Sequence, residues 1–211
     1  MLEKLVKNIG SKITTIALAG TLLLGSGCAT YKTMSPSLIQ PVTPIERPIK
    51  RPIDYSKLTW QEAIEYVQTP EQAQDYLDTH LSQVAEGAYE SFRLNHTDRT
   101  GVCYDYAMAA AALLSDNGFP PILLELDGKN GDHSVFLYRI NDSFYALGNT
   151  PVPEPSRNIV DLIKRISSKY GMNFDDYFII NLDENYPDRK WIDGEKINSK
   201  LFSPLDAMRI H

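Results

Sequence analysis

The sequence predicts an α+β domain in which helices come first and mostly antiparallel strands follow. Between residues 59 and 116, apolar side chains recur at the three- and four-residue spacing of helices. Between residues 121 and 147, short apolar runs are separated by turn residues, as strands are. The composition is that of a globular protein, with 43% hydrophobic and 23% charged residues among 211. This is enough chain for one domain or two small ones.

Capping residues and apolar spacing predict the first helices. Residues 59–68 form one, and the next begins where Thr69 can cap, Pro70 suits the first helical position and Gln72 completes a capping box. A further helix is expected over residues 84–94. The clearest helix is the alanine-rich stretch 102–116.

The chain after this helix reads mainly as strands joined by turns. Strands are expected over residues 121–126, 133–140, 143–147 and 177–182, with a tight turn at Asn141-Asp142 and a helix over 157–170 that Gly171 ends. The last 25 or so residues give no clear pattern.

Charge and cysteine content exclude several classes of function. The 21 Lys and Arg against 27 Asp and Glu give a net charge of −6, whereas a protein that binds duplex nucleic acid needs a basic excess. Two cysteines, Cys28 and Cys103, are too few for a disulfide framework or a four-cysteine zinc site. The sequence has no phosphate loop, dinucleotide fingerprint or His-Glu-x-x-His motif, so we expect neither cofactor nor metal.

Residues 1–27 have the layout of a secretory signal peptide, with lysines, then an uncharged stretch over 13–24, then small residues. Twelve residues are too few to cross a bilayer core of about 30 Å as a helix. With Cys28 at its end, the segment resembles a bacterial lipoprotein signal, which implies cleavage before Cys28 and a lipid on that residue. Ala29 then indicates the outer membrane in a cell that has two. The alternatives are an ordinary exported protein cut nearby and an uncleaved anchor.

Residues 28–57 are expected to be a proline-rich tether between the lipid and a folded domain over residues 58–211. Five prolines lie between residues 36 and 52, and each removes a backbone donor and opposes helix. We therefore expect this stretch to be extended and poorly packed. At roughly 3.1 Å per residue it holds the domain tens of ångströms from the membrane.

The candidate catalytic residues are Cys103, His133 and Asn149. Cys103 opens the predicted helix, where unpaired N–H groups favour a thiolate and can hold an oxyanion. His133 begins a strand and can act as base and then as acid. Asn149 follows the next strand, and a hairpin turning at Asn141-Asp142 returns it to the level of His133, where it can orient the imidazole.

The order and spacing of these residues resemble the transglutaminase-like superfamily of thiol enzymes. The similarity covers about residues 58–182 and is carried by Thr69–Ala73, Thr100–Ala107, Leu113-Leu114, Gly118 and Gly131–Val135. It implies a papain-like core in which a nucleophile helix packs on a mostly antiparallel sheet. Many members end the third strand with Asp, where this chain has Gly148 or Asn149. Asn95 is the one candidate for a side-chain oxyanion donor upstream of the cysteine.

The expected function is an envelope-anchored thiol hydrolase or acyl transferase that acts on protein or peptide amides, cell-wall peptides included. The alternative is a non-catalytic binding or scaffold lipoprotein with the same fold. Tyr104-Asp105 after the cysteine argues against wall endopeptidases with a Cys-Ser-Gly motif, and the lack of a second thiol in the mature chain argues against a redox role.

Several other polar and aromatic residues are expected to have structural roles. Asp105 complements the helix dipole, and His80 and His96 lie at the surface. For Tyr104, Tyr106 and Tyr138, lining a substrate cleft and packing in the core remain equally good interpretations.

Overall fold

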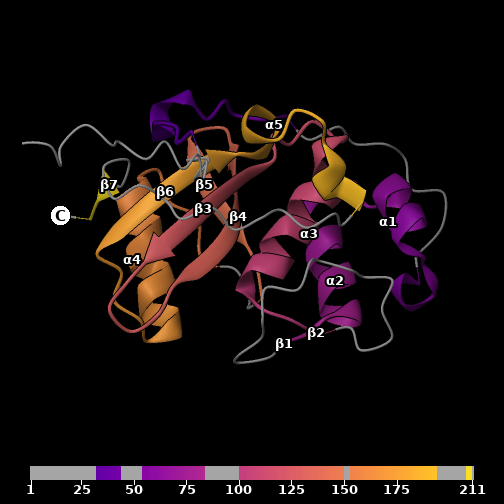
Figure 1. Ribbon diagram of the computed structural model, residues 1–211, viewed down its shortest axis with the longest axis horizontal. Coiled ribbons are helices and arrows are strands. Elements are labelled where there is room, and N and C mark those ends of the chain that lie inside the picture. The colour runs from indigo at the N-terminus through magenta and orange to yellow at the C-terminus, as the bar shows by residue number, and fades with distance from the viewer. Residues whose placement is uncertain (1–31, 44–53, 84–99, 150–152, 194–207, 211) are drawn as a thin grey trace, which may run out of the picture.

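The computed structural model describes residues 32–43, 54–83, 100–149, 153–193 and 208–210 (Figure 1). The helices described are η1 (Pro36–Leu38), η2 (Tyr55–Lys57), α1 (Trp60–Tyr66), α2 (Pro70–His80), α3 (Cys103–Ser115), α4 (Ile159–Tyr170), α5 (Leu182–Asn185) and η3 (Lys190–Asp193). The strands are β1 (Ser82–Gln83), β2 (Thr100–Gly101), β3 (Ile122–Asp127), β4 (His133–Ile140), β5 (Ser143–Leu147), β6 (Asp176–Asn181) and β7 (Met208–Arg209).

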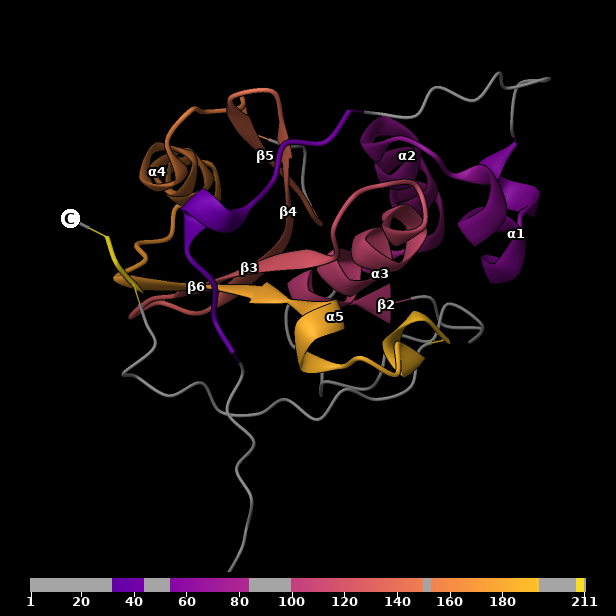
Figure 2. The ribbon, with the colours of Figure 1, turned by 90° about the horizontal axis from the view of Figure 1, so that it is seen from above.

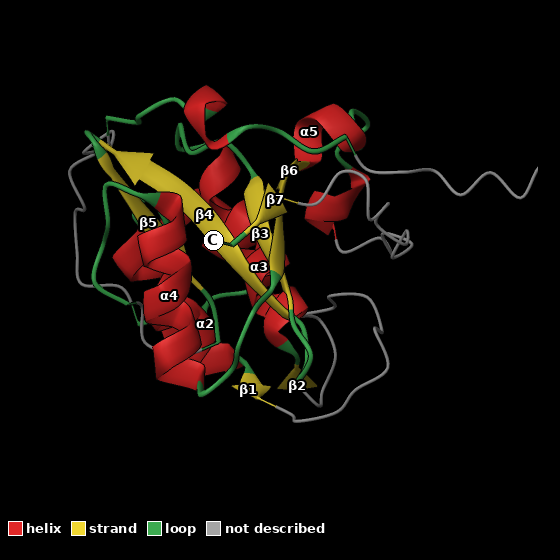
Figure 3. Cartoon of the chain, turned by 90° about the vertical axis from the view of Figure 1, so that its left-hand side faces the viewer, coloured by secondary structure: helices red, strands yellow, loops and turns green. Residues whose placement is uncertain are grey.

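An antiparallel sheet in the order β5-β4-β3-β6-β7 forms the middle of the molecule. The helices α1, α2 and α3 cover one face and α4 covers the other, as Figure 2 shows from above and Figure 3 from the side. The two-residue strands β1 and β2 form a separate parallel pair just before α3. The α+β class predicted from the sequence is confirmed, and so is the packing of the cysteine helix on the sheet.

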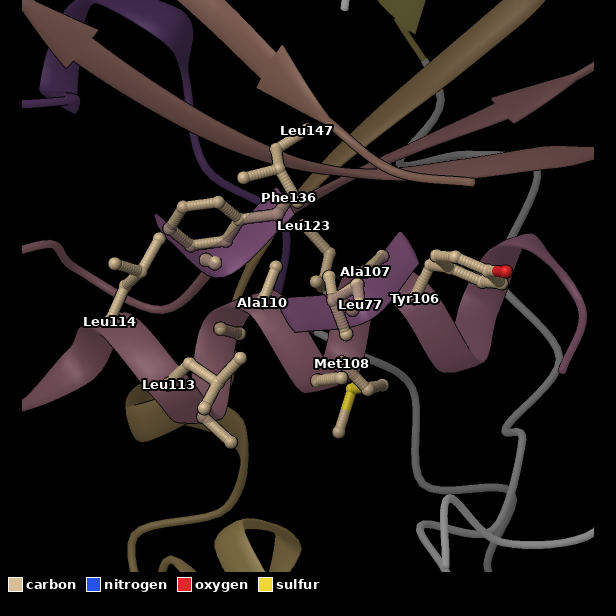
Figure 4. Close-up of a cluster of buried hydrophobic side chains, with 14 of the residues drawn as sticks. Leu77, Tyr106, Ala107, Met108, Ala110, Leu113, Leu114, Leu123, Phe136 and Leu147 are labelled. Carbon is tan, nitrogen blue, oxygen red and sulfur yellow. The ribbon is translucent and has the colours of Figure 1, made fainter. Parts of the chain in front are cut away.

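The core between α3 and the sheet accounts for the alanine-rich sequence of that helix. Small buried side chains such as Ala107 and Ala110 let α3 lie close to the strands. Leu123, Phe136 and Leu147 point from the sheet towards this helix (Figure 4). On β4 the even-numbered side chains therefore face α3, because successive side chains of a strand alternate between the two faces.

The odd-numbered side chains of β4 face α4 and form a second core. Val135 and Leu137 pack there with the apolar stripe of α4. Asn158 caps the start of this helix, because its Oδ1 accepts the Val160 N–H at 2.8 Å. Gly171 caps the end, with the left-handed φ of 67° that glycine adopts without strain.

Most predicted elements are confirmed, with ends that differ by at most two residues, and β4 and β5 have the predicted bounds. The capping box at Thr69 and Gln72 is formed as predicted. The helix predicted over residues 84–94 lies outside the described residues. The C-terminal stretch without a clear pattern contains η3 and β7, and the short helix α5, which was not predicted, precedes it. Of the helices described, none has the length and apolar character needed to span a bilayer.

Residues 32–43 are packed on the sheet, so the expectation of a poorly packed tether is wrong for this segment. The Met34 N–H donates to the Ile179 carbonyl and the Val42 N–H to the Arg139 carbonyl, both at 2.8 Å. Ile39 is 1% exposed in the α4-side core, and the segment crosses that side in indigo in Figure 2. The reason is that strand edges here offer backbone partners, and the apolar residues between the prolines are buried on them.

Candidate active site

Cys103 is the first residue of α3, and its neighbours fix the helix start. The Asp105 carboxylate accepts the Val102 N–H at 2.8 Å, which caps the first turn. Gly101 leaves the room for this contact, because a Cβ at that position would lie 3.1 Å from the Asp105 Cβ. The expected role of Asp105 at the helix start is thus confirmed. Burial raises the pKa of Asp105 to about 6.

The Cys103 thiol faces Ser134 of β4. Hydrogen bonding from Ser134 and from the Tyr104 backbone lowers the pKa of the thiol. The thiol is partly buried, and this burial, with a smaller contribution from the nearby Glu125 carboxyl, raises the pKa of the thiol above its usual value. The thiolate expected from the helix start is therefore not favoured here, because loss of hydration outweighs the helix N–H groups.

Glu125 lies directly across the β3–β4 ladder from Ser134. The Ser134 hydroxyl donates to Oε2 of Glu125, whereas Oε1 is buried and no described residue hydrogen bonds to it. Burial raises the pKa of Glu125 to about 7, and the negative charge of Asp132 adds to this. A thiol, a hydroxyl and a carboxyl thus form a row on the α3 face.

His133 is the residue before Ser134, and its ring lies on the opposite face of the sheet. Its centroid is 4.1 Å from that of Tyr170 at the end of α4 and 6.3 Å from that of Phe174. The side chain is 4% exposed, and Nε2 has no hydrogen-bond partner among the described residues. Burial lowers the pKa of His133 to about 4, so the imidazole is neutral at pH 7.

Asn149 lies close to His133 through a shared contact with Tyr170. The Tyr170 hydroxyl donates to Asn149 Oδ1 at 3.3 Å while the Tyr170 ring packs on the imidazole. The structure therefore brings two of the three predicted catalytic residues, His133 and Asn149, to one place. Within the described residues, no hydrogen bond joins Cys103 to His133.

Sequence reasoning did not find Glu125, Ser134 or Tyr170. Glu125 had a signal, since it is the one charge within the otherwise apolar run from Ile122 to Leu126. Ser134 could have been found by asking which of two consecutive strand residues shares the face of the cysteine helix. Tyr170 gave no signal, because it reaches His133 from an element 37 residues later in the chain.

Three further expectations concerned histidine and tyrosine side chains. His80 was expected at the surface, which is wrong, because it is 5% exposed and its Nε2 lies 2.6 Å from the Tyr55 carbonyl. Tyr106 and Tyr138 are buried core residues, the first bonded to the Leu81 carbonyl at 2.8 Å. Cys28, Asn95 and His96 lie outside the described residues.

Metal-ligating side chains do not gather in groups of three or more in the described part of the chain. A family model described as a transglutaminase-like domain matches residues 47–172, more than half of the chain. The chain belongs to the transglutaminase-like domain family. The match includes Cys103, His133, Asn149 and Tyr170, but it ends before β6 and begins after the docked segment 32–43. No curated protein matches this transglutaminase-like chain.

Proposed function

We propose that this transglutaminase-like protein is a thiol hydrolase or acyl transferase that acts on protein or peptide amides, with Cys103 as nucleophile. One observation carries the proposal: in a chain of this family, the free cysteine among the described residues is the first residue of a 13-residue helix packed against the sheet. A thiol placed there can attack a carbonyl beside unpaired helix N–H groups.

The reaction joins the Cys103 sulfur to the carbonyl carbon and breaks the amide C–N bond. The proton of the thiol goes to the leaving amine, and the acyl group stays on sulfur as a thioester. Water then gives a carboxylic acid, or an amine gives a new amide, and the thiol is restored. The backbone N–H of Cys103, at the first residue of α3, is the proposed donor to the oxyanion.

His133 is the proposed carrier of that proton, with Asn149 orienting it. In the described conformation its ring faces α4, and rotation of a side chain does not carry it through a sheet. A one-residue change of strand register at the start of β4, which exchanges the faces of His133 and Ser134, must therefore come before it meets the thiol. We therefore assign this conformation to the resting protein. The protonated thiol and the neutral, buried imidazole support that assignment.

Trapping of an acyl-enzyme tests the proposal. A chain beginning at Ala29 has Cys103 as its one thiol, and incubation with an N-acetyl dipeptide p-nitrophenyl ester should add one acyl group, as read by intact mass. Cys103→Ala should abolish the adduct. His133→Ala and His133→Phe should each slow its formation about 100-fold, since general acid–base catalysis contributes at least that much. The Phe variant fills the space beside Tyr170, so it separates loss of the imidazole from loss of packing.

A second candidate function is a non-catalytic binding domain of the same fold. The observation in its favour is the separation of Cys103 and His133 by the β4 backbone. It predicts that the native chain forms no acyl adduct and that Cys103 reacts only after unfolding.

We also propose that a lipid on Cys28 anchors the protein in a bacterial cell envelope, on the outer membrane where there are two. The docked segment 32–43 then limits the distance between the lipid and the folded domain. The Lys32 N–H donates to the Asn185 side chain at 2.7 Å, and Asn185 donates back to the Lys32 carbonyl at 3.1 Å. Four residues reach at most about 14 Å, so α5 would lie close to the lipid surface, in place of the tens of ångströms expected from a free tether. Cys28→Ala should move the protein from the membrane to the soluble fraction; unchanged membrane retention would contradict the anchor.

A further inference from the structure

Glu125 is a buried carboxyl that the proposed reaction does not use. Its side chain enters the α3 face from β3, where its neighbours along the strand are apolar. Oε2 accepts one hydrogen bond from Ser134, and Oε1 is buried with no partner in the described part of the chain. A carboxylate in this position costs folding free energy, because burial removes hydration that one hydrogen bond does not replace. A buried carboxyl at this position is therefore expected to have a function that offsets this cost.

The position of Glu125 relative to the Cys103 nucleophile indicates such a function. Ser134 acts on both groups, since its hydroxyl donates to the carboxyl and its backbone hydrogen bonds to the Cys103 sulfur. Ser134 is 4% exposed, so little water lies around this row to screen the carboxyl from the thiol. Two acidic groups so close in a poorly hydrated place do not readily carry two negative charges together.

We propose that Glu125, held in place by Ser134, keeps the Cys103 thiol protonated in the resting site. Glu125 is thus a positioning residue that sets the ionisation of the nucleophile. This rests on the proposed role of Cys103, and it adds a control that is independent of His133. When the carboxyl is ionised, a thiolate beside it is disfavoured; when its charge is absent, the thiolate forms more easily.

The charged groups around this pair decide at which pH the carboxyl carries its charge. Asp132, in the loop before β4, acts on Glu125 with a negative charge that raises the pKa of the carboxyl, so Glu125 disfavours the thiolate only as the pH rises to about 7 and above. Asp105, in the first turn of α3, has its carboxylate bonded to the Val102 N–H. On β6 the residue opposite Glu125 is Phe178, which carries no charge. Among the ion pairs of the described residues, none involves Glu125.

The rate of Cys103 alkylation by iodoacetamide tests this control. In Glu125→Gln, the curve of rate against pH should move to lower pH by about one unit, because a neighbouring charge shifts a pKa by about one to three units. At pH 8 to 9, where the carboxyl of the native sequence is ionised, the reaction should therefore be about five- to tenfold faster in the variant. Glu125→Met, which removes the charge with similar side-chain length, should move the curve in the same direction. Glu65→Gln, an exposed site on α1, is the matched control and should leave it unchanged.

Two results overturn the proposal. Unchanged curves in both Glu125 variants would show that the carboxyl does not act on the thiol. Slower alkylation in both, with the fold intact by circular dichroism, would show that the carboxyl promotes thiolate formation. Failure of the acyl-enzyme test leaves this measurement intact, since iodoacetamide needs no catalytic base. A negative result here likewise says nothing against acylation of Cys103.

Discussion

Ser134, and not the adjacent His133, is the residue of β4 that faces Cys103. The two side chains leave the strand in opposite directions, so the thiol meets a hydroxyl bonded to Glu125 while the imidazole packs on Tyr170. The β4 backbone therefore divides the candidate site into a thiol half and an imidazole half. Catalysis by the proposed route requires His133 to cross that division.

Replacing Tyr170 should release His133 from burial. In Tyr170→Ala, the pKa of His133 should rise from about 4 by at least about one unit towards 6.5, because burial is what lowers it. Tyr170→Phe keeps the ring and loses the bond to Asn149, so the pKa of His133 should stay low. Titration of the imidazole signals by NMR measures both. An unchanged pKa in the Ala variant would mean that other groups keep His133 dry.

The pH dependence of stability should contain two opposite contributions. The pKa of Glu125 is raised from 4.5 to about 7, so its stabilising contribution is complete below pH 4.5 and is lost as the pH rises to about 7. The pKa of His133 is lowered from 6.5 to about 4, so its contribution is complete above pH 6.5 and is lost as the pH falls to about 4. Each amounts to about 3 kcal/mol.

Urea unfolding across pH 4 to 8 separates these contributions. Glu125→Gln should gain about 3 kcal/mol over the native sequence at pH 8 relative to pH 4. His133→Phe should gain a similar amount at pH 4 relative to pH 8. The same pH curve in a variant and in the native sequence would contradict the assignment of that residue as buried and shifted.

The packed segment 32–43 should contribute to folding stability. Ile39→Ala should lower the free energy of unfolding by about 2 to 5 kcal/mol, because Ile39 is buried in the α4-side core. Leu38→Ala, one residue earlier, changes a side chain that is 60% exposed and should stay within about 0.5 kcal/mol. Chemical denaturation of the two variants gives the comparison. Equal, small effects would show that the segment does not belong to the folded domain.

The start of α3 should depend on the carboxylate of Asp105. Asp105→Ala leaves the Val102 N–H without its acceptor and should destabilise the protein by about 1 kcal/mol, the usual cost of losing a helix cap. Asp161→Ala in the first turn of α4 is the control, because Asn158 already caps that helix. Thermal unfolding measures the loss of stability in both variants. A larger loss in the control would show that the Asp105 contact does not hold the helix start.

The fold was largely readable from local patterns, because capping residues, apolar spacing and turn residues act within a few positions. Thr69 with Gln72 and the stop at Gly171 are examples. The docking of residues 32–43 could not be predicted, since proline content determines local backbone geometry and does not show which strand edges elsewhere in the fold are free. The expectation that His80 lies at the surface was wrong for a similar reason, because its partner, the Tyr55 carbonyl, lies 25 positions away in the sequence.

The sequence indicated candidate residues for the site, but it did not predict on which side of the sheet each of them lies. Asn149 and His133 both contact Tyr170, a residue that the hairpin geometry did not include. The face of the sheet that His133 occupies depends on strand register, and a shift of one residue exchanges His133 for Ser134. The raised pKa of the Cys103 thiol depends on burial, which no spacing in the sequence reveals.

The pH dependence of Cys103 alkylation in the native chain tests the central claim most directly, which is that thiol and imidazole are unpaired in the resting protein. The account predicts an apparent thiol pKa above the value of about 8.5 for free cysteine, and the same pKa in His133→Ala. An apparent pKa well below 8 that His133→Ala abolishes would contradict it, because the thiolate and the imidazole would then already be paired.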